Sequence, residues 1–404
     1  MVEYPYMDER QRFSDHFFIA AAIVVASYII IYGVIGQGPL SHCVYDSYTR
    51  QAAAWWQGRL SLPENVTWLE LATYRGEYFV SFPPFPSVVQ FLLYPVFGMN
   101  TPDNLVNSLF GLGSFVLVYR FLYRRGYGGL SASVFALLMT LGTNLFYISA
   151  TGWVWFSAQT QAFFFSVLAV YLIYSEKKTA WYFSFLSLGI AFACRPFQVV
   201  YAPLMVYLLY YNFGNEKGFL RTLLGCVKYA LPFLFVGGLV AAYNYARFGD
   251  IFEFGHNYLP EFMESEQFSF LYVPGNFMEI LKLPGSEELF WPRFNGTLFF
   301  LVNPVFVALA ISLFRGFGER ESVYFLCFIV HFVLLLTHRT MGGWQFGCRY
   351  LVDLIPFMLV VFEGDGAYKK SAAGREAVLP ISLAAAGIAI NIWGAVWYYT
   401  QPMI

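Results

Sequence analysis

Residues Phe17 to Ile35, FFIAAAIVVASYIIIYGVI, form an apolar run without a single charge. A helix rises about 1.5 Å per residue, so a run of this length crosses the hydrocarbon core of a bilayer. The rest of the chain agrees with this. Of its 404 residues 58% are hydrophobic and 12% are charged, against roughly 25% charged in a soluble domain. The sequence therefore predicts an integral membrane protein.

Further apolar runs follow at intervals, and together they predict an all-α polytopic fold with about eleven transmembrane helices. We expect one membrane-embedded domain over residues 1–404, with two long outer loops at 37–103 and 246–297 that carry short interfacial helices. The run 85–96 is short and proline-bracketed, which indicates a re-entrant or surface helix. The expected spans lie at about residues 17–36, 104–122, 129–148, 156–174, 180–195, 197–212, 223–245, 298–314, 322–337, 349–363 and 377–398.

The distribution of Lys and Arg predicts the orientation. A cytoplasmic N-terminus, with the first span kept as an anchor, puts most cations in short cytoplasmic loops; the C-terminus and both long loops are then outside the inner membrane. Several cations remain on the outer side, against the usual bias, and their number favours an anionic ligand there. Ion pairing with nearby carboxylates is the alternative for each one. The outer cations are Arg50, Arg59, Arg75, Arg247, Lys282, Arg293, Arg339 and Arg349.

The segment from His42 to Pro95 is charged and aromatic in an otherwise apolar chain, and it directly follows the first span. Polar groups in such a place indicate a ligand at the membrane surface, so we interpret the segment as an active-site loop. Asp46 stands at the start of a predicted interfacial helix, Asp46 to Gln57. A helix cap is therefore the structural alternative for this carboxylate.

Other features narrow the function. A net charge of −1 argues against a nucleic-acid partner, because binding a phosphate backbone needs a concentrated basic surface. No HExxH or DxD motif and no metal-ligand spacing occurs, so we expect metal-independent chemistry, with a divalent cation left open. The cysteines form no CxxC pair; a disulfide between Cys43 and Cys348 is one possibility on the outer side.

Four stretches together resemble the GT-C superfamily of polytopic glycosyltransferases, in particular bacterial relatives of the dolichyl-phosphate-mannose-protein mannosyltransferases and aminoarabinose transferases. They are the outer loop with Asp46 and Tyr48, YRGEYFVSFPPFPSVVQFLLYPVFG at Tyr74 to Gly98, AAYNYARFGDIFEFGHNY at Ala241 to Tyr258 and GGWQFGCRYLVDLIPF at Gly342 to Phe357. The likeness covers most of the chain by topology. Asp46 departs from the pattern, because the second acidic residue that many relatives carry beside it is missing.

The resemblance implies transfer of a sugar from a polyprenyl-phosphate-linked donor to a lipid, glycan or protein acceptor on the outer face, with inversion. Asp46 would be the general base. Cations would hold the phosphate of the leaving lipid, and polar and aromatic groups would bind the sugar and acceptor. The phosphate candidates are Arg75, Arg349, Arg339, Arg293 and Lys282, and the sugar or acceptor candidates are Tyr48, Tyr74, Glu77, Tyr78, His256, His338 and Trp344.

Three other functions fit parts of the sequence. A polymerase or ligase that joins lipid-linked glycans would differ from this transferase in its donor and not in its architecture. A secondary transporter usually has a polar site at the bilayer midplane and internal repeats, whereas here the charges lie at the outer edge and no repeat is evident. A scaffold without catalysis is the third. The sugar, the carrier length and the acceptor stay open.

Overall fold

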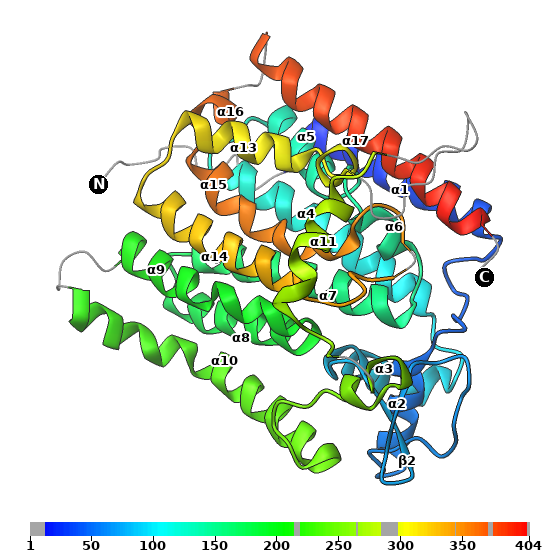
Figure 1. Cartoon of the computed structure of the whole chain (residues 1–404). Coiled ribbons are helices and arrows are strands. Elements are labelled where there is room, and N and C mark those ends of the chain that lie inside the picture. Colours follow the sequence, from blue (N-terminus) through cyan, green and yellow to red (C-terminus); the bar gives the residue numbers. More distant parts are fainter. Residues whose placement is uncertain are drawn as a thin grey trace.

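The computed structural model describes residues 13–213, 219–263, 266–283, 298–343, 345–370 and 375–401. Its main body is a bundle of helices, drawn in the upper part of Figure 1, and a smaller lobe built from the first long loop lies below it. The helices of the bundle are α1 Asp15–Ile35, α4 Asp103–Arg124, α5 Gly129–Met139, α6 Leu145–Ala150, α7 Val154–Ile173, α8 Lys178–Cys194, α9 Ala202–Phe213, α10 Phe219–Phe248, α12 Phe299–Val302, α13 Val305–Arg315, α14 Glu319–Leu336, α15 Leu359–Gly364, α16 Gly366–Lys370 and α17 Arg375–Thr400.

Five helices in the described ranges are long and apolar enough to cross a membrane: Asp15–Ile35, Asp103–Arg124, Val154–Ile173, Gly225–Phe248 and Ala377–Thr400. The chain is thus a membrane protein. The expected total of eleven spans is not confirmed, because several apolar runs are divided. The run 129–148 is split between α5 and α6, and the run 349–363 forms the 3₁₀ segments η6 Arg349–Leu354 and η7 Pro356–Met358 before α15.

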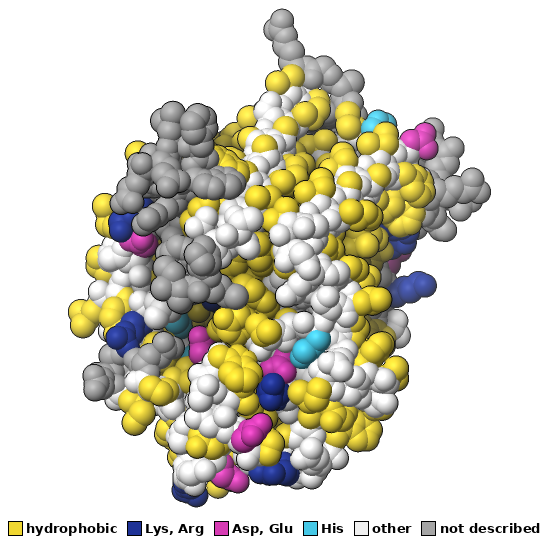
Figure 2. Space-filling view, turned by 90° about the vertical axis from the view of Figure 1, so that its right-hand side faces the viewer, with side chains coloured by type: hydrophobic (Ala, Val, Ile, Leu, Met, Phe, Trp, Pro, Cys, Tyr) yellow, Lys and Arg dark blue, Asp and Glu magenta, His cyan; other side chains and the backbone are white. Residues whose placement is uncertain are grey.

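Helix α1 is apolar on all sides, and it has one buried face and one exposed face. Phe17, Ala20, Val24 and Ile31 form its buried stripe, at helical spacing. The opposite side exposes large apolar residues such as Ile29, as expected for contact with lipid. Helix α1 packs beside α17 and α5, and this face of the molecule is largely apolar in Figure 2. Many of its charged side chains lie at the lower end.

The first long loop folds into a small lobe of its own, comprising helix α2 Ser47–Trp56, strands β1 Leu71–Tyr74 and β2 Glu77–Val80, and helix α3 Phe85–Phe97. The two antiparallel strands pair Leu71 with Val80 and Tyr74 with Glu77. Arg75 and Gly76 both have positive φ at the tip, as a tight two-residue hairpin turn requires. The all-α expectation therefore needs one correction: the loop contains a two-stranded antiparallel sheet, formed by backbone pairing of residues 71–74 with 77–80.

Apolar packing fixes this lobe on the bundle. Tyr48 of α2, Leu62 and Phe82 form a cluster with Val154 and Ala158 at the start of α7. The short helix α3, expected as a re-entrant or surface helix, buries Pro86, Ser87 and Gln90 and exposes Leu92 and Val96. The second long loop contributes the short segments η3 His256–Tyr258, η4 Pro260–Phe262, η5 Phe270–Tyr272 and α11 Val273–Ile280, and η2 Pro196–Tyr201 links α8 to α9.

The orientation inferred from the cations can be tested by labelling single cysteines from outside the cell. All five natural cysteines are buried, so background labelling is expected to be low. A cysteine at exposed Asn65 should react with a membrane-impermeant maleimide in intact cells. A cysteine at exposed Lys178 should react only after permeabilisation. Labelling of Lys178→Cys in intact cells, with none of Asn65→Cys, would invert the orientation.

Candidate active site

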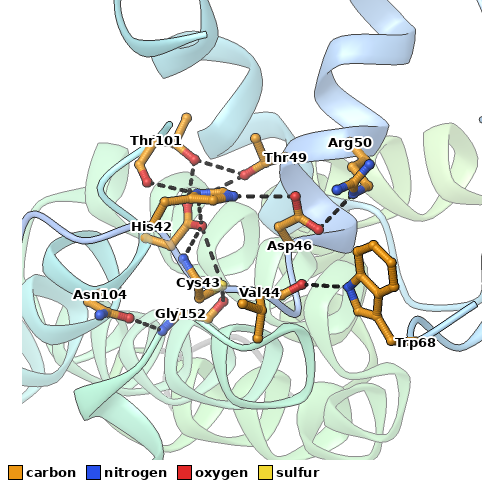
Figure 3. Close-up of polar contacts among 11 residues, drawn as sticks. His42, Cys43, Val44, Asp46, Thr49, Arg50, Trp68, Thr101, Asn104 and Gly152 are labelled. Atoms are coloured by element: carbon orange, nitrogen blue, oxygen red, sulfur yellow. Dashed lines mark hydrogen bonds and ion pairs between the residues drawn. The ribbon is translucent and has the colours of Figure 1, made fainter. Parts of the chain in front are cut away.

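Asp46 lies at the N-terminal cap position of α2, but its side chain makes no capping hydrogen bond. The carboxylate instead meets two nitrogen groups. Oδ1 accepts a hydrogen bond from Nε of Arg50 at 2.8 Å, one helical turn further on, and Oδ2 lies 3.3 Å from Nε2 of His42. The side chain is 4% exposed. Asp46 is thus a buried carboxylate with two basic neighbours, as Figure 3 shows.

His42 lies between Asp46 and a second carboxylate that is distant in sequence. Its Nε2 faces Asp46, while its Nδ1 lies 2.7 Å from Oδ2 of Asp103 and 3.1 Å from the carbonyl oxygen of Thr101. Asp103 is 2% exposed and begins α4. Its carboxylate also accepts hydrogen bonds from Thr101 Oγ1 and Thr49 Oγ1 and contacts Cys43 Sγ at 3.4 Å. The start of α4 therefore completes a polar cluster that α2 begins.

The electrostatic consequence is a charged histidine. Burial disfavours the charged imidazole, but hydrogen bonding and Coulomb attraction to Asp103, with a further hydrogen bond to Asp46, outweigh it and raise the pKa of His42 to about 10. His42 is therefore protonated at neutral pH. Two carboxylates, one imidazolium and the guanidinium of Arg50 then make up a cluster whose charges balance.

A cavity of about 490 Å³ lies next to this cluster, where α7, α8, η2 and the second long loop meet. Its charged and polar lining includes Arg195, Arg349, His256, His338 and Glu253. The aromatic part of the lining consists of Phe82, Trp155, Phe197, Phe252, Phe254, Phe268 and Tyr350. A cavity of this size, with aromatic walls and a few convergent polar groups, is the usual form of a small-molecule site.

Arg349 is buried in the wall of this cavity, at the start of η6. One terminal nitrogen donates to Gln159 Oε1 at 2.8 Å and the other to the carbonyl oxygen of Gly342 at 3.1 Å. Nε is buried and has no hydrogen-bond partner in the described structure. No described carboxylate forms an ion pair with Arg349. Its guanidinium meets only neutral groups in the described structure: these two acceptors and the rings of Tyr350 and Phe156, whose centres lie 4.9 and 5.8 Å away. Such a buried cation is costly unless an anion joins it.

Arg195 is the second cation in the cavity wall, and its partners are different. Its Nε donates to Asp353 Oδ2 at 2.8 Å, and its guanidinium lies 4.7 Å from the ring centre of Tyr350. Gln159 joins the two arginines, because its amide nitrogen donates to Asp353 Oδ1 at 3.3 Å and its amide oxygen accepts from Arg349. A connected polar network thus orients both guanidinium groups.

The two cavity histidines are neutral. Burial, followed by the charge of Arg195, lowers the pKa of His256 to about 4. Burial, together with His256, Arg195 and Arg349, lowers the pKa of His338 to about 3. Neutral imidazoles can donate or accept hydrogen bonds but add no charge. Arg195 and Arg349 therefore supply the positive charge of the cavity wall.

Asp46 is close to the cavity but is not one of its lining residues. The adjacent Tyr45 packs its ring 5.0 Å from that of Trp155, which lines the cavity. Tyr48 likewise lies 6.5 Å from Phe82, another lining residue. The residues on either side of Asp46 thus pack against the wall of the cavity.

The structure brings only some of the predicted residues into this region. Arg349, His256 and His338 line the cavity. Tyr48 is buried in the adjoining wall with a hydroxyl that has no partner in the described structure, and Tyr78 packs against the same apolar cluster.

Other predicted residues lie elsewhere. Arg75 is exposed at the hairpin tip, 5.0 Å from the ring centre of Tyr74, and Tyr74 packs on Phe248. Glu77, at the same tip, accepts a hydrogen bond from Ser61. Arg75 is a turn residue and Glu77 is the first residue of β2, so neither reaches the cavity wall.

Two further candidate cations, Lys282 and Arg339, do not line the cavity either. Lys282 is exposed and paired with Glu279. Arg339 is exposed, 5.9 Å from the ring centre of Phe262. Arg293 and Trp344 lie outside the described residues. Of the cations that the sequence places on the outer side as an expectation, Arg50 and Lys282 form ion pairs.

Two further expectations concern cysteines and metals. The possible Cys43–Cys348 disulfide is wrong, because both cysteines are free and buried. In the described ranges no group of three or more His, Cys, Asp or Glu side chains is arranged to hold a metal ion.

Sequence reasoning missed four polar residues of this region: His42, Asp103, Arg195 and Gln159. Asp103 and Arg195 stand at the ends of apolar runs, where a charged residue ordinarily marks the membrane boundary. Gln159 lies inside the apolar run of α7 together with Gln161, and amides in such a run are a local signal of a buried polar network.

No protein-family model and no curated protein matches this sequence. Solved structures do match the fold. ArnT from Cupriavidus metallidurans bound to undecaprenyl phosphate is 13% identical, with a TM-score of 0.54 over 95% of this chain and 76% of that chain. The apo state of the same protein is 14% identical, with a TM-score of 0.52 and the same coverage. At this identity the likeness shows the fold. The chain therefore has the GT-C fold, as its sequence resemblance predicted.

Proposed function

We propose that this protein is a glycosyltransferase that moves a sugar from a polyprenyl-phosphate donor to an acceptor at the outer face of the membrane. The fold is consistent with this reaction, and one structure with a similar fold, that of ArnT, was determined bound to undecaprenyl phosphate. The observation that carries the proposal is the buried Arg349 in the cavity wall. Its hydrogen bonds go to neutral acceptors, and its Nε has no partner among the residues that the structure describes.

Arg349 and Arg195 are the proposed phosphate-binding groups. Arginine presents several donors in a planar fork and stays charged, which suits a phosphate that leaves as an anion. The network through Gln159 and Asp353 holds both guanidinium groups before the donor arrives. Preorganised donors of this kind stabilise charge that develops in the transition state.

The proposed step is a single displacement at the anomeric carbon. The acceptor oxygen forms the new bond to that carbon while the bond from the carbon to the phosphate oxygen breaks, and its electron pair leaves with the lipid phosphate. The configuration at the anomeric carbon is therefore inverted. A base must take the acceptor proton as the sugar gains oxocarbenium character. The departing phosphate gains negative charge beside the two arginines.

Asp46 is the proposed base. Its carboxylate is buried and is oriented from two sides, by Arg50 and by His42. It stands at the N-cap of α2, between Tyr45 and Tyr48, whose rings pack against the cavity-lining residues Trp155 and Phe82. Glu253 and Glu266 are the competing carboxylates because both line the cavity itself. The oxygens of the buried Glu253 accept from Gly255 N and Asn257 Nδ2. Both oxygens of Glu253 thus carry one hydrogen bond each, as do both oxygens of Asp46, and the two carboxylates are separated by substitution.

Lipid-phosphate recognition is tested directly with the purified protein in nanodiscs. Undecaprenyl phosphate should bind, and it should inhibit transfer from a polyprenyl-phosphate sugar competitively. Undecaprenol, which has the same chain without the phosphate, should do neither at the same concentration. Equal binding of both lipids would contradict the proposal that Arg195 and Arg349 bind the phosphate. Uptake of a solute by proteoliposomes, with no cleavage of any lipid-linked sugar, would favour a transporter.

A further inference from the structure

His42 occupies an unusual position between two buried carboxylates. Nε2 lies 3.3 Å from Asp46 Oδ2, and Nδ1 lies 2.7 Å from Asp103 Oδ2 and 3.1 Å from the carbonyl oxygen of Thr101. Each of these neighbours is an acceptor when the carboxylates are ionised. A neutral imidazole carries one N–H and can satisfy only one side. The geometry therefore requires a hydrogen on both ring nitrogens.

We propose that His42 is the positioning residue of Asp46, acting as an imidazolium whose Nδ1 side is anchored by Asp103 and whose Nε2–H orients the Asp46 carboxylate. The role rests on the proposed function, in which Asp46 is the base. Asp103 acts as the counter-ion and does not touch substrate. It is in turn fixed by the hydroxyls of Thr49 and Thr101. The anchor on α4 thus sets the direction of a side chain on α2.

The charges around His42 support this role. Asp46 and Asp103 face its ring, Cys43 contacts Asp103, and Arg50 lies beyond Asp46 on the far side. The imidazolium and Arg50 hold separate oxygens of Asp46, Oδ2 and Oδ1 respectively. Two contacts on two oxygens fix the plane of a carboxylate, whereas the contact with Arg50 alone leaves it free to turn. Placement of a reacting group within a fraction of an ångström matters strongly for rate.

We call the arrangement Asp46–His42–Asp103 the bridge. Two amide replacements of His42 test its two sides separately. In His42→Gln the side-chain amide nitrogen stands near the place of Nε2, which keeps a donor toward Asp46. In His42→Asn it stands near Nδ1, which keeps a donor toward Asp103. Both remove the charge. We expect kcat to fall by up to about 100-fold, the loss that a misplacement of about 1 Å causes, and to fall less in His42→Gln than in His42→Asn. The KM for the lipid donor should stay within the error of the wild type.

The pH dependence of thermal unfolding gives a second readout that needs no activity. The folded-state pKa of His42, about 10, exceeds its ordinary value of 6.5. Its contribution to stability is therefore complete below pH 6.5 and is lost as the pH rises toward 10. The Tm of the wild type should fall between pH 7 and pH 10 more than the Tm of either His42 variant. His16→Gln, at an exposed histidine at the start of α1, should keep the wild-type pH dependence.

The outcomes separate this inference from the proposed function. An inactive Asp46→Asn protein combined with fully active His42 variants would keep the base and overturn the bridge. Equal pH dependence of Tm in the wild type and both His42 variants would overturn the charged state of His42, whether or not any sugar is transferred. A lower kcat in both variants, with the Tm difference present, supports the bridge. A fall in donor affinity alone would contradict it, because that would place His42 on the donor side.

Discussion

Replacing Asp46 by asparagine is expected to lower the rate of sugar transfer by about 100- to 10,000-fold, the usual loss when a general base is removed. The change removes the proton acceptor at nearly constant volume. The amide oxygen of asparagine can still accept from Arg50 or His42, so the small lobe should keep its fold. Transfer is measured with the purified variant in nanodiscs at saturating donor and acceptor, and binding of undecaprenyl phosphate should stay close to the wild-type level.

The matched control is Glu64→Gln, the same chemical change at an exposed position of the same loop, which should leave the rate unaltered. Glu253→Gln provides the comparison within the cavity. If Asp46→Asn keeps more than about a third of the wild-type rate, against the loss expected for a base, Asp46 is not the base. A large loss in Glu253→Gln under the same conditions would then assign that role to Glu253.

Arg349→Lys is expected to weaken use of the lipid-phosphate donor, with kcat/KM for the donor reduced by about 10-fold or more, since a charge-assisted hydrogen bond contributes about 1.5 to 3 kcal/mol. Lysine keeps the charge but lacks the planar fork, so it cannot bind Gln159, the Gly342 carbonyl and a phosphate oxygen at once. The dependence of rate on acceptor concentration should stay unchanged. The measurement is the initial rate across a series of donor concentrations.

Two other arginines make this test specific. Arg59→Lys changes an exposed residue of the first long loop and should behave as the wild type. Arg75→Lys examines a residue that the sequence favoured for phosphate binding but that lies at the hairpin tip. A larger effect on donor use from Arg75→Lys than from Arg349→Lys would contradict the assignment of the phosphate to the cavity. It would instead indicate that the hairpin itself meets the donor.

Hydropathy predicted which segments are apolar but did not establish the number of helices that cross the membrane. Hydropathy identified the apolar runs, and α1, α4, α7, α10 and α17 are long enough to cross a membrane. It did not identify where a run breaks. Asn303 and Pro304 separate α12 from α13, where proline removes a backbone donor. Asn144 and Asn303 there bond to each other across the bundle, and Asn391 bonds to Asn144 from α17. The polar groups at such a break form hydrogen bonds with residues far along the chain. A short window of sequence therefore cannot show where a helix ends.

The sequence by itself determined the class of this protein and the segment that holds its candidate base. Partition between water and lipid depends on local composition, so the membrane class, the length of α1 and the polar character of the first long loop could all be inferred from the order of residues. The same reasoning singled out Asp46, because a carboxylate just beyond a span is conspicuous without knowledge of any contact.

Tertiary structure alone decided which charged groups act together. Asp103 reaches His42 from the start of α4, and Arg195 joins Arg349 in one cavity because Asp353 and Gln159 connect η2, η6 and α7. Arg75, equally charged, is held at a hairpin tip. The physical reason is that an ion pair depends on distance in space, which the packing of helices sets over long separations in sequence, whereas hydropathy is a property of each segment alone.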